Sequence, residues 1–162
     1  MKQLKSLGLI LFTGTILSCA STSSTATTNN PPDKDKYVVG DTAFGGIIFM
    51  INADGTHGLV AALQDQMVNS DYHECAEQIN DPRFHDEIGK EYFDWRLPKL
   101  WEAYKMYMNL HLVNLGNFSA SSYWTSKEWT GFDKMYVLNF SKGVDFTSLK
   151  SDTYRARAVR SF

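Results

Sequence analysis

The sequence predicts an α+β domain over residues 37–162, because it combines two segments typical of β-hairpins with one segment typical of an amphipathic helix. A third observation is the alternation of alanine and arginine near the C-terminus, which is typical of a strand. Aromatic residues make up 14% of the chain and can supply a packed core. We therefore expect one globular domain.

The first hairpin is predicted over residues 45–63. Two β-rich runs, Ile47–Asn52 and Gly58–Leu63, flank an Asp54-Gly55 pair. Asp-Gly between two such runs is a strong signal for a tight turn that joins antiparallel strands. The polar and mixed residues 64–94 come next, and there we expect loops and short helices.

The helix is predicted over residues 97–110. Large side chains recur there at spacings of three and four residues, and Pro98 suits the first helical turn. The residues at these spacings are Leu97, Leu100, Trp101, Tyr104, Tyr107 and Met108.

Three more β-rich segments complete the predicted domain. Residues 118–129 are expected to lead from a loop into a strand through Tyr123 and Trp124. Residues 135–150 hold two β-rich runs on either side of Ser141-Lys142-Gly143, which predicts a second hairpin. The alternation over residues 155–162 predicts a final strand with the alanines on one face and the arginines on the other.

Residues 1–18 resemble a lipoprotein signal peptide. Lys2 and Lys5 form a positive region, and an apolar run too short to span a bilayer follows them. Ile16-Leu17-Ser18-Cys19 resembles a bacterial lipobox, which implies a mature chain that starts at a lipidated Cys19. The alternative is an ordinary secretory signal, cut within residues 20–24. Because no Asp follows Cys19, the resemblance favours the outer membrane of the cell envelope, on either its periplasmic or its surface face.

Residues 19–36 are expected to form a flexible tether from the lipidated cysteine. After Cys19 the segment contains Ser, Thr, Asn, Pro and charged residues but no large apolar side chain. It therefore cannot bury enough surface to offset its chain entropy. A coil of this length spans roughly 20 to 25 Å.

The charge of the chain argues against nucleic-acid binding. There are 16 basic and 18 acidic residues, for a net charge of −2, and the leader takes two of the lysines. Residues 127–162 are locally basic, with seven basic and four acidic residues. We expect a solvated face of scattered strand charges there, and a patch for an anionic ligand is the alternative.

Five segments carry a family resemblance: GGIIFMINADGTHGLVAA at 45–62, DWRLPKLWE at 94–102, YWTSKEW at 123–129, LNFSKG at 138–143 and the terminal RARAVRSF. In this order they resemble the Lcl C-terminal domain family of bacterial envelope proteins. The resemblance implies a C-type-lectin-like fold with small antiparallel sheets, one or two helices, long loops, and adjacent N- and C-terminal strands. We interpret Asp94–Pro98 as scaffold, in which Trp95 fills the core and Arg96 bridges carbonyls or a carboxylate.

No motif indicates a metal site or a cofactor, and we expect neither. The tripeptides with which calcium-dependent lectins hold their ion do not occur. His73, Cys75, His85 and Asp86 do not have the spacing of a closed zinc site.

We also expect no enzymatic activity, because no nucleophile elbow, Cys-His signature or phosphate loop is present. His57 is expected to be a hydrogen-bonded turn histidine, with a lone acid or base as the alternative. If Cys19 is acylated, Cys75 is the only free thiol. We expect Cys75 to be buried, and the alternatives are an intermolecular disulfide or a nucleophile.

The candidate ligand site lies in the aromatic and basic stretch 123–136. Flat aromatic faces beside cations suit a saccharide or a peptide. Trp124 and Tyr136 are expected in the core instead. The candidate ligand-binding residues are therefore Trp129, Phe132, Lys127 and Lys134.

These observations predict a membrane-anchored envelope lipoprotein with a non-enzymatic, C-type-lectin-like binding or adhesion domain. Its expected partners are the membrane, through the N-terminal lipid, and a glycan or an envelope protein. The alternative is a structural accessory subunit of an envelope or surface assembly, which would use the same surface for a protein partner.

Overall fold

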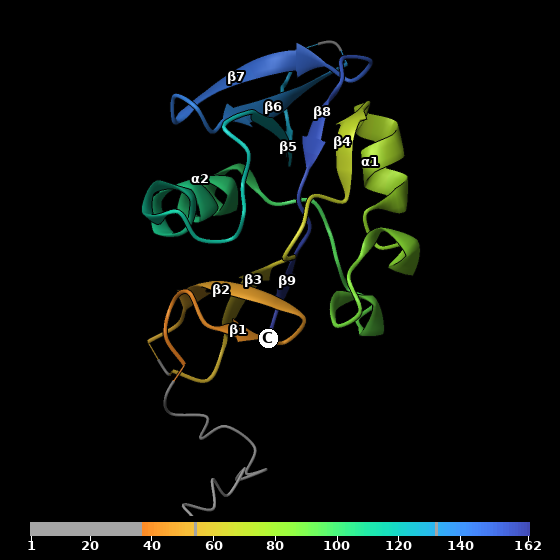
Figure 1. Cartoon of the computed structure of the whole chain (residues 1–162). Coiled ribbons are helices and arrows are strands. Elements are labelled where there is room, and N and C mark those ends of the chain that lie inside the picture. Colours follow the sequence, from red (N-terminus) through yellow and green to blue (C-terminus); the bar gives the residue numbers. More distant parts are fainter. Residues whose placement is uncertain (1–36, 54, 132) are drawn as a thin grey trace, which may run out of the picture. The chain divides into compact units, whose positions relative to one another are not determined.

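The computed structural model describes residues 37–162 except Asp54 and Phe132. The predicted leader, the lipidation site Cys19 and the tether, all within residues 1–36, lie outside the described residues, as does the candidate ligand residue Phe132. The described part is an α+β fold with two sheets and two α-helices (Figure 1). No helix in this part is both long enough and apolar enough to cross a bilayer.

The strands form one four-stranded and one five-stranded sheet. The first sheet has the order β1 (Thr42–Ala43), β2 (Gly46–Ile51), β3 (Gly58–Ala61) and β9 (Val159–Ser161). The second has the order β4 (Met67–Ser70), β8 (Tyr154–Ala156), β5 (Ser122–Glu128), β6 (Lys134–Asn139) and β7 (Val144–Leu149). Neighbouring strands pair antiparallel, except that β5 and β8 run parallel.

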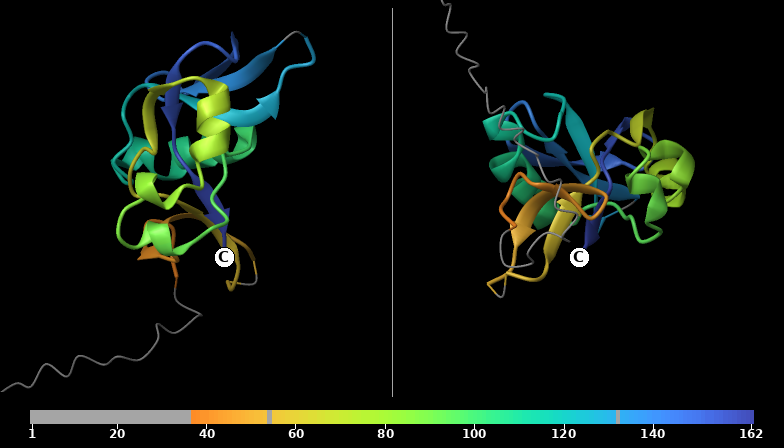
Figure 2. Two further views of the ribbon diagram at one scale, coloured as in Figure 1. Left: turned by 90° about the vertical axis from the view of Figure 1, so that its right-hand side faces the viewer. Right: turned by 60° about the horizontal axis from the view of Figure 1, so that its bottom comes forward.

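Two α-helices and three 3₁₀ turns connect the strands. They are α1 (Tyr72–Gln78), η2 (Pro82–Phe84), η3 (Gly89–Glu91), α2 (Leu100–Asn109) and η4 (His111–Val113). Helix α1 and the turns η2 and η3 lie within residues 64–94, where short helices were expected, and α2 lies within the helix predicted over residues 97–110. The strand β4 in the same 64–94 stretch was not predicted, because its pairing partner β8 lies far along the chain. Helices α1 and α2 lie on opposite sides of the strands (Figures 1 and 2).

Alternate residues of the strands enter two different hydrophobic cores. Ile48 and Trp124 belong to the core that also contains Cys75 of α1. Their chain neighbours Phe49 and Tyr123 belong to the core on the side of α2. Because successive side chains of a strand point to opposite faces, strands covered on both sides must be apolar at consecutive positions. Trp124 is confirmed as a core residue, at 0% exposure.

Both predicted hairpins are confirmed. Strands β2 and β3 pair from Ile47 opposite Ala61 to Ile51 opposite Gly58. Strands β6 and β7 pair without a register shift along their whole length. Gly143 in the second turn has a φ of 67°, a conformation that favours glycine.

The first and last strands share a sheet but are not adjacent, which corrects the expectation from the family resemblance. Strand β9 pairs with β3, and β1 lies at the opposite edge, beside β2. The tight turn through Phe44 and Gly45, with φ values of 54° and 84°, folds β1 back onto β2. Because β2 occupies one side of β3, the C-terminal strand β9 pairs with the other side of β3.

The predicted final strand is in fact two strands in two different sheets. Strand β8 belongs to the second sheet and β9 to the first, and Arg157-Ala158 connects them. Arg157 does not face solvent as the alternation indicated, because its exposed fraction is 1%. Its guanidinium donates to the carbonyl oxygens of Ala62, Gly116 and Asn117 at 2.7 to 3.1 Å.

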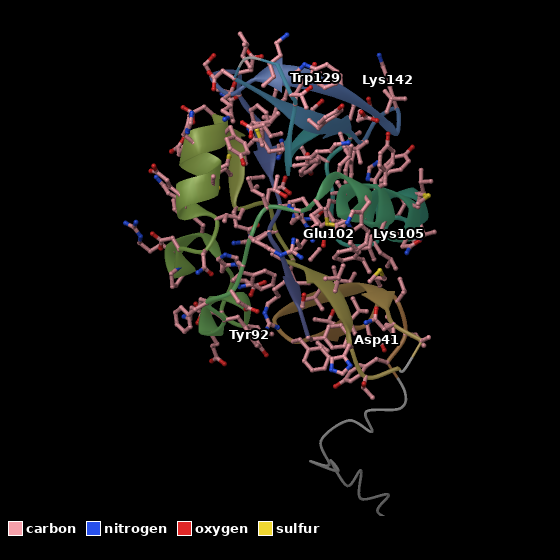
Figure 3. All side chains as sticks on the ribbon, turned by 180° about the vertical axis from the view of Figure 1, so that it is seen from behind. Asp41, Tyr92, Glu102, Lys105, Trp129 and Lys142 are labelled. Atoms are coloured by element: carbon pink, nitrogen blue, oxygen red, sulfur yellow. The ribbon has the colours of Figure 1, made fainter. Side chains whose placement is uncertain are left out.

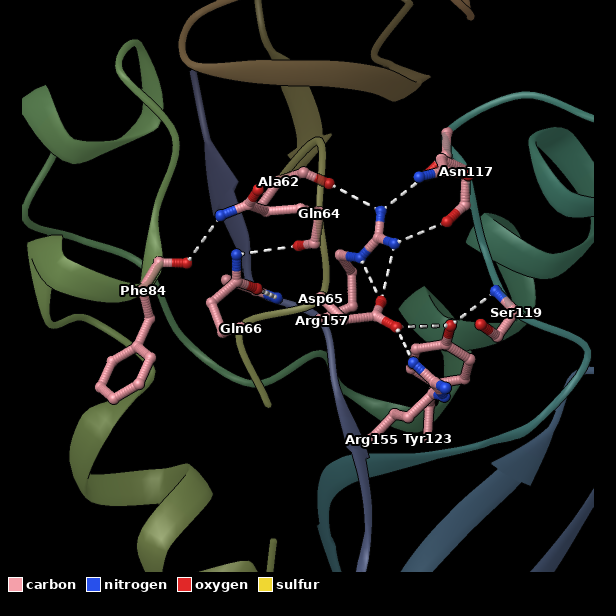
Figure 4. A network of polar contacts seen from close by, with 12 residues as sticks. Ala62, Gln64, Asp65, Gln66, Phe84, Asn117, Ser119, Tyr123, Arg155 and Arg157 are labelled. Atoms are coloured by element: carbon pink, nitrogen blue, oxygen red, sulfur yellow. Dashed lines mark hydrogen bonds and ion pairs between the residues drawn. The ribbon is translucent and has the colours of Figure 1, made fainter. Parts of the chain in front are cut away.

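Asp65 completes a buried polar network around Arg157 (Figure 4). Its Oδ1 accepts from Nε of Arg157 at 2.7 Å, and its Oδ2 accepts from Arg155 at 2.9 Å and from the Tyr123 hydroxyl at 3.1 Å. Burial, together with the Asp65 charge, raises the pKa of Tyr123 to about 12. The arginines at 155 and 157 are thus structural, since buried charges need partners of this kind.

The Asp94–Pro98 segment is scaffold, as predicted. Trp95 is 3% exposed, and its indole Nε1 donates to the carbonyl of Gly89 at 2.8 Å. Arg96 binds both carboxylate oxygens of Glu102, at 2.7 and 2.9 Å. Helix α2 begins at Leu100, so Pro98 precedes the helix and is not part of its first turn.

Candidate ligand-binding groove

An open groove lies between the start of α2 and strand β5. Its volume is about 670 Å³. The backbone N–H of Ser126 donates to the carbonyl of Pro98 at 2.8 Å, which ties β5 to the segment that leads into the helix. The side chains that line the groove are those of Lys99, Leu100, Trp101, Tyr104, Ser126 and Lys127.

The orientation of α2 explains why aromatic rings face this groove. Glu102 points inward and is 1% exposed, and its carboxylate also accepts from the backbone N–H of Lys99 at 2.8 Å. Trp101 precedes Glu102 and is therefore turned outward, with 47% of its surface exposed. Tyr104, three residues later, lies next to Trp101 on the helix surface.

Two further hollows adjoin the groove. They measure about 390 and 300 Å³, and each is lined in part by Arg96 and Lys99. One extends toward the first hairpin and the C-terminal residue Phe162, and the other extends toward α1. Lys99 lines all three hollows, so an extended ligand could cross this surface.

The groove carries positive charge. Neither Lys99 nor Lys127 forms an ion pair with a described residue, whereas the charge of Arg96 is matched by Glu102. The Lys127 ammonium lies 4.4 Å from the centre of the Tyr136 ring, a cation–π contact. An anionic or polar group of a ligand therefore meets two cations here, next to aromatic surface.

Tyr104 is held at the edge of the groove by β7. Its hydroxyl donates to Oδ1 of Asp145 at 2.5 Å. This hydrogen bond raises the pKa of Tyr104, so the side chain remains a neutral donor or stacking surface at physiological pH. A fixed ring costs a ligand less ordering entropy than a mobile one.

The residues predicted for the site are only partly brought together. Lys127 lines the groove, and Tyr136 joins it to Trp129, whose ring centre lies 5.7 Å from that of Tyr136. Trp129 is 44% exposed and directly follows β5, at the opposite end of the described part from Asp41 (Figure 3). Lys134 starts β6, where its carbonyl accepts from the backbone N–H of Trp129 at 2.9 Å. Tyr136 is half-buried rather than a core residue.

Five lining residues were not predicted from the sequence: Lys99, Leu100, Trp101, Tyr104 and Ser126. Trp101 and Tyr104 were read as part of the apolar spacing that predicted the helix. The buried apolar positions of α2 are instead Ala103 and Met106, together with Leu110 just after the helix. Their spacing of three and four residues is a signal that could have identified the buried face.

Of the other candidate residues, Cys75 and His85 are buried, whereas His57 lines the hollow that extends toward Phe162. Cys75 is buried, and burial raises its pKa to about 12, so its thiol stays protonated at neutral pH. His85 is buried against Trp95, with Nε2 at 2.8 Å from the carbonyl of Ile79. Burial lowers the pKa of His85, which keeps the ring neutral. His57 Nδ1 lies 2.8 Å from the Thr56 hydroxyl.

Among the described residues, no three His, Cys, Asp or Glu side chains lie close enough together to hold a metal ion. His73, Cys75, His85 and Asp86 therefore do not converge in this structure. Comparison of the sequence with family models and with curated proteins found no match. The resemblance to the Lcl C-terminal domain family stays a prediction.

Proposed function

We propose that this chain is an envelope lipoprotein, anchored by lipid at Cys19, whose domain over residues 37–162 binds a ligand without transforming it. The domain is a C-type-lectin-like member of the Lcl C-terminal domain family, and the ligand is a glycan of the envelope or of a surface outside the cell. Residues 19–36 tether the domain to the outer membrane.

The observation that carries the proposal is the groove at the start of α2. Trp101 presents an exposed ring beside Lys99 and Lys127, two cations without an acidic partner among the described residues. Sugar rings stack on flat aromatic surfaces, and their hydroxyl or acidic groups need polar partners. The adjoining hollows give room for more than one sugar unit.

The chemistry of the groove supports binding rather than catalysis. The six residues that line the groove at the start of α2 include no carboxylate, thiol or imidazole, groups that general acid–base catalysis or nucleophilic attack commonly uses. The adjoining hollow toward Phe162 does include His57 and Glu102, but the Glu102 carboxylate is already bound by Arg96. Cys75, the thiol of the described part, is a buried residue of α1 and does not line the groove.

A binding measurement with the purified lipidated protein tests the proposal. The protein is held in detergent micelles and applied to a glycan array, with and without calcium, and hits are titrated. We expect calcium-independent binding. Trp101→Ala should raise the Kd at least about tenfold, as for other central aromatic contacts. Lys127→Gln should also weaken binding, with a larger effect at low salt.

Lys142→Gln is the matched control. It removes the same charge from the exposed turn between β6 and β7, outside the groove, and should leave the Kd unchanged. Trp129→Ala tests how far the site extends along the second sheet. Absence of any glycan hit, or hits with equal affinity in the Trp101 and Lys142 variants, would contradict the proposed site.

A structural accessory subunit is the second candidate, and strand β7 favours it. In the described part β7 pairs only with β6, so its outer edge is open. Val144, Phe146 and Leu149 on this strand are 37 to 51% exposed. An open, apolar edge strand is a surface to which another protein can add a strand.

A photo-reactive amino acid at Val144 tests the second candidate in intact cells. An accessory subunit predicts one dominant cross-linked envelope protein. The same probe at Glu77, on the exposed surface of α1, is the control and should give no such product. Indistinguishable products from the two positions would argue against assembly through β7.

A further inference from the structure

Five apolar side chains are exposed where the described chain enters the domain. Val38 is 60% and Val39 is 40% exposed. In the turn that follows α2, the exposed fractions are 58%, 56% and 40% for Leu112, Val113 and Leu115. We call these five residues the entry patch.

The two segments that carry the entry patch approach each other at Gly40, which follows Val39, and Leu115. A Cβ placed on Gly40 would lie only 3.0 Å from Cδ1 of Leu115. The backbone N–H groups of Val113 and Leu115 both donate to the carbonyl of Leu110, at 3.2 and 2.9 Å. Asn114 has a φ of 58°, which ends η4 and reverses the chain. This compact turn holds its apolar residues beside the entry of the chain.

A group of large apolar side chains on a surface indicates an interaction site. These five side chains carry no charge and do not line the groove at the start of α2. These side chains can therefore be stabilised by burial in an apolar environment, but they cannot attract a charged partner.

We propose that the entry patch rests on the lipid bilayer that holds the acyl chains of Cys19. This inference depends on the proposed lipoprotein anchor, because residues 20–36 come directly before the described chain and would, as a flexible coil, reach only roughly 20 to 25 Å. A surface tethered so close to a bilayer meets it at high effective concentration. A small apolar patch then suffices for contact, as it does for peripheral membrane segments.

Docking through the entry patch would keep the ligand groove accessible. The groove lies at the start of α2 and the patch follows its end. The ten residues of α2 separate the two surfaces by about 15 Å. The bilayer would thus orient the domain without covering Trp101.

Fluorescence quenching in vesicles tests this inference. The full lipidated protein is reconstituted in vesicles of phosphatidylethanolamine and phosphatidylglycerol that contain a nitroxide-labelled phosphatidylcholine. Leu112→Cys carries a thiol-reactive fluorophore, and Glu77→Cys on α1 is the matched control. Cys75 is buried, so the introduced thiol is the accessible one. We expect roughly twofold stronger quenching at position 112 than at 77, because interfacial side chains lie within reach of the nitroxide.

Val113→Cys repeats the measurement at a second exposed position and should behave like Leu112→Cys. Vesicle flotation is measured on the same samples. Equal quenching at 112 and 77 in protein that floats would overturn the docking inference and leave the anchor intact. Protein that fails to float would refute the anchor, and the docking inference with it.

Discussion

The guanidinium of Arg96 binds both oxygens of Glu102, at 2.7 and 2.9 Å, and this pair determines how α2 meets the rest of the domain. Glu102 is 1% exposed, and its Oε2 also accepts from the backbone N–H of Lys99 at 2.8 Å. One carboxylate therefore accepts a backbone N–H at the start of the helix and, through its bond to Arg96, fixes the rotation of α2 about its own axis. The outward position of Trp101 follows from it.

We expect Glu102→Ala to lower the free energy of unfolding by about 2 to 4 kcal/mol, because it leaves Arg96 and the helix start without their acceptor. Urea titration followed by circular dichroism measures the change. Glu77→Ala, at an exposed position of α1, should change stability by less than about 0.5 kcal/mol. Equal effects of the two substitutions would show that the pair does not stabilise the fold.

Arg157→Ala should destabilise the domain more than Arg155→Ala. Arg157 is 1% exposed and is the partner of Asp65 at 2.7 Å, so its loss leaves a buried carboxylate poorly compensated, at a cost of about 3 to 5 kcal/mol. The side chain of Arg155 is 25% exposed, and water can replace part of its contact. Chemical denaturation of both variants measures the difference. A larger loss in Arg155→Ala would contradict the assigned roles.

The Cys75 thiol should react slowly in the folded protein. Burial raises its pKa to about 12, so almost no thiolate forms at pH 8, and the side chain is out of reach of the reagent. Reaction with a chromogenic disulfide reagent should proceed readily only after urea is added. Rapid reaction without urea would refute the buried, protonated state.

The same shift in pKa predicts a loss of stability at alkaline pH. The folded state holds the Cys75 proton more tightly, with a pKa raised from 9.0 to about 12. The unfolded chain therefore loses this proton first, and stability falls as pH rises from about 9 toward 12. Unfolding free energies across this range should fall less steeply in Cys75→Ala. Parallel curves for the two proteins would contradict the prediction.

Cys19→Ala should abolish lipidation. Cells fed an alkyne-tagged fatty acid should label the wild-type protein and not the variant, and the variant should keep the length of the precursor, because the lipobox enzymes act at this cysteine. Cys75→Ala is the control and should be labelled like the wild type. An unlabelled wild-type protein, processed within residues 20–24, would instead indicate an ordinary secretory signal.

Local patterns predicted much of the fold. The glycine-containing turns of both hairpins and the spacing of side chains over 97–110 act within a few residues, so the sequence reports them directly. The candidate site was predicted in part. Lys127 lines the groove, and Trp129 is exposed beside Tyr136. The residues contributed by α2 were not predicted, because helical spacing alone does not say which side of the helix faces the core.

The sequence by itself predicted both hairpins, the helix within 97–110 and the scaffold role of Trp95, but not the short strands β1 and β4. The lipobox-like leader stays a prediction. Only the tertiary structure decided which face of α2 is exposed and that the final strand divides between two sheets. The reason is the distance over which the interactions act. Arg157 is buried because of Asp65, 92 positions earlier in the chain, and no local alternation of residues reports such a partner.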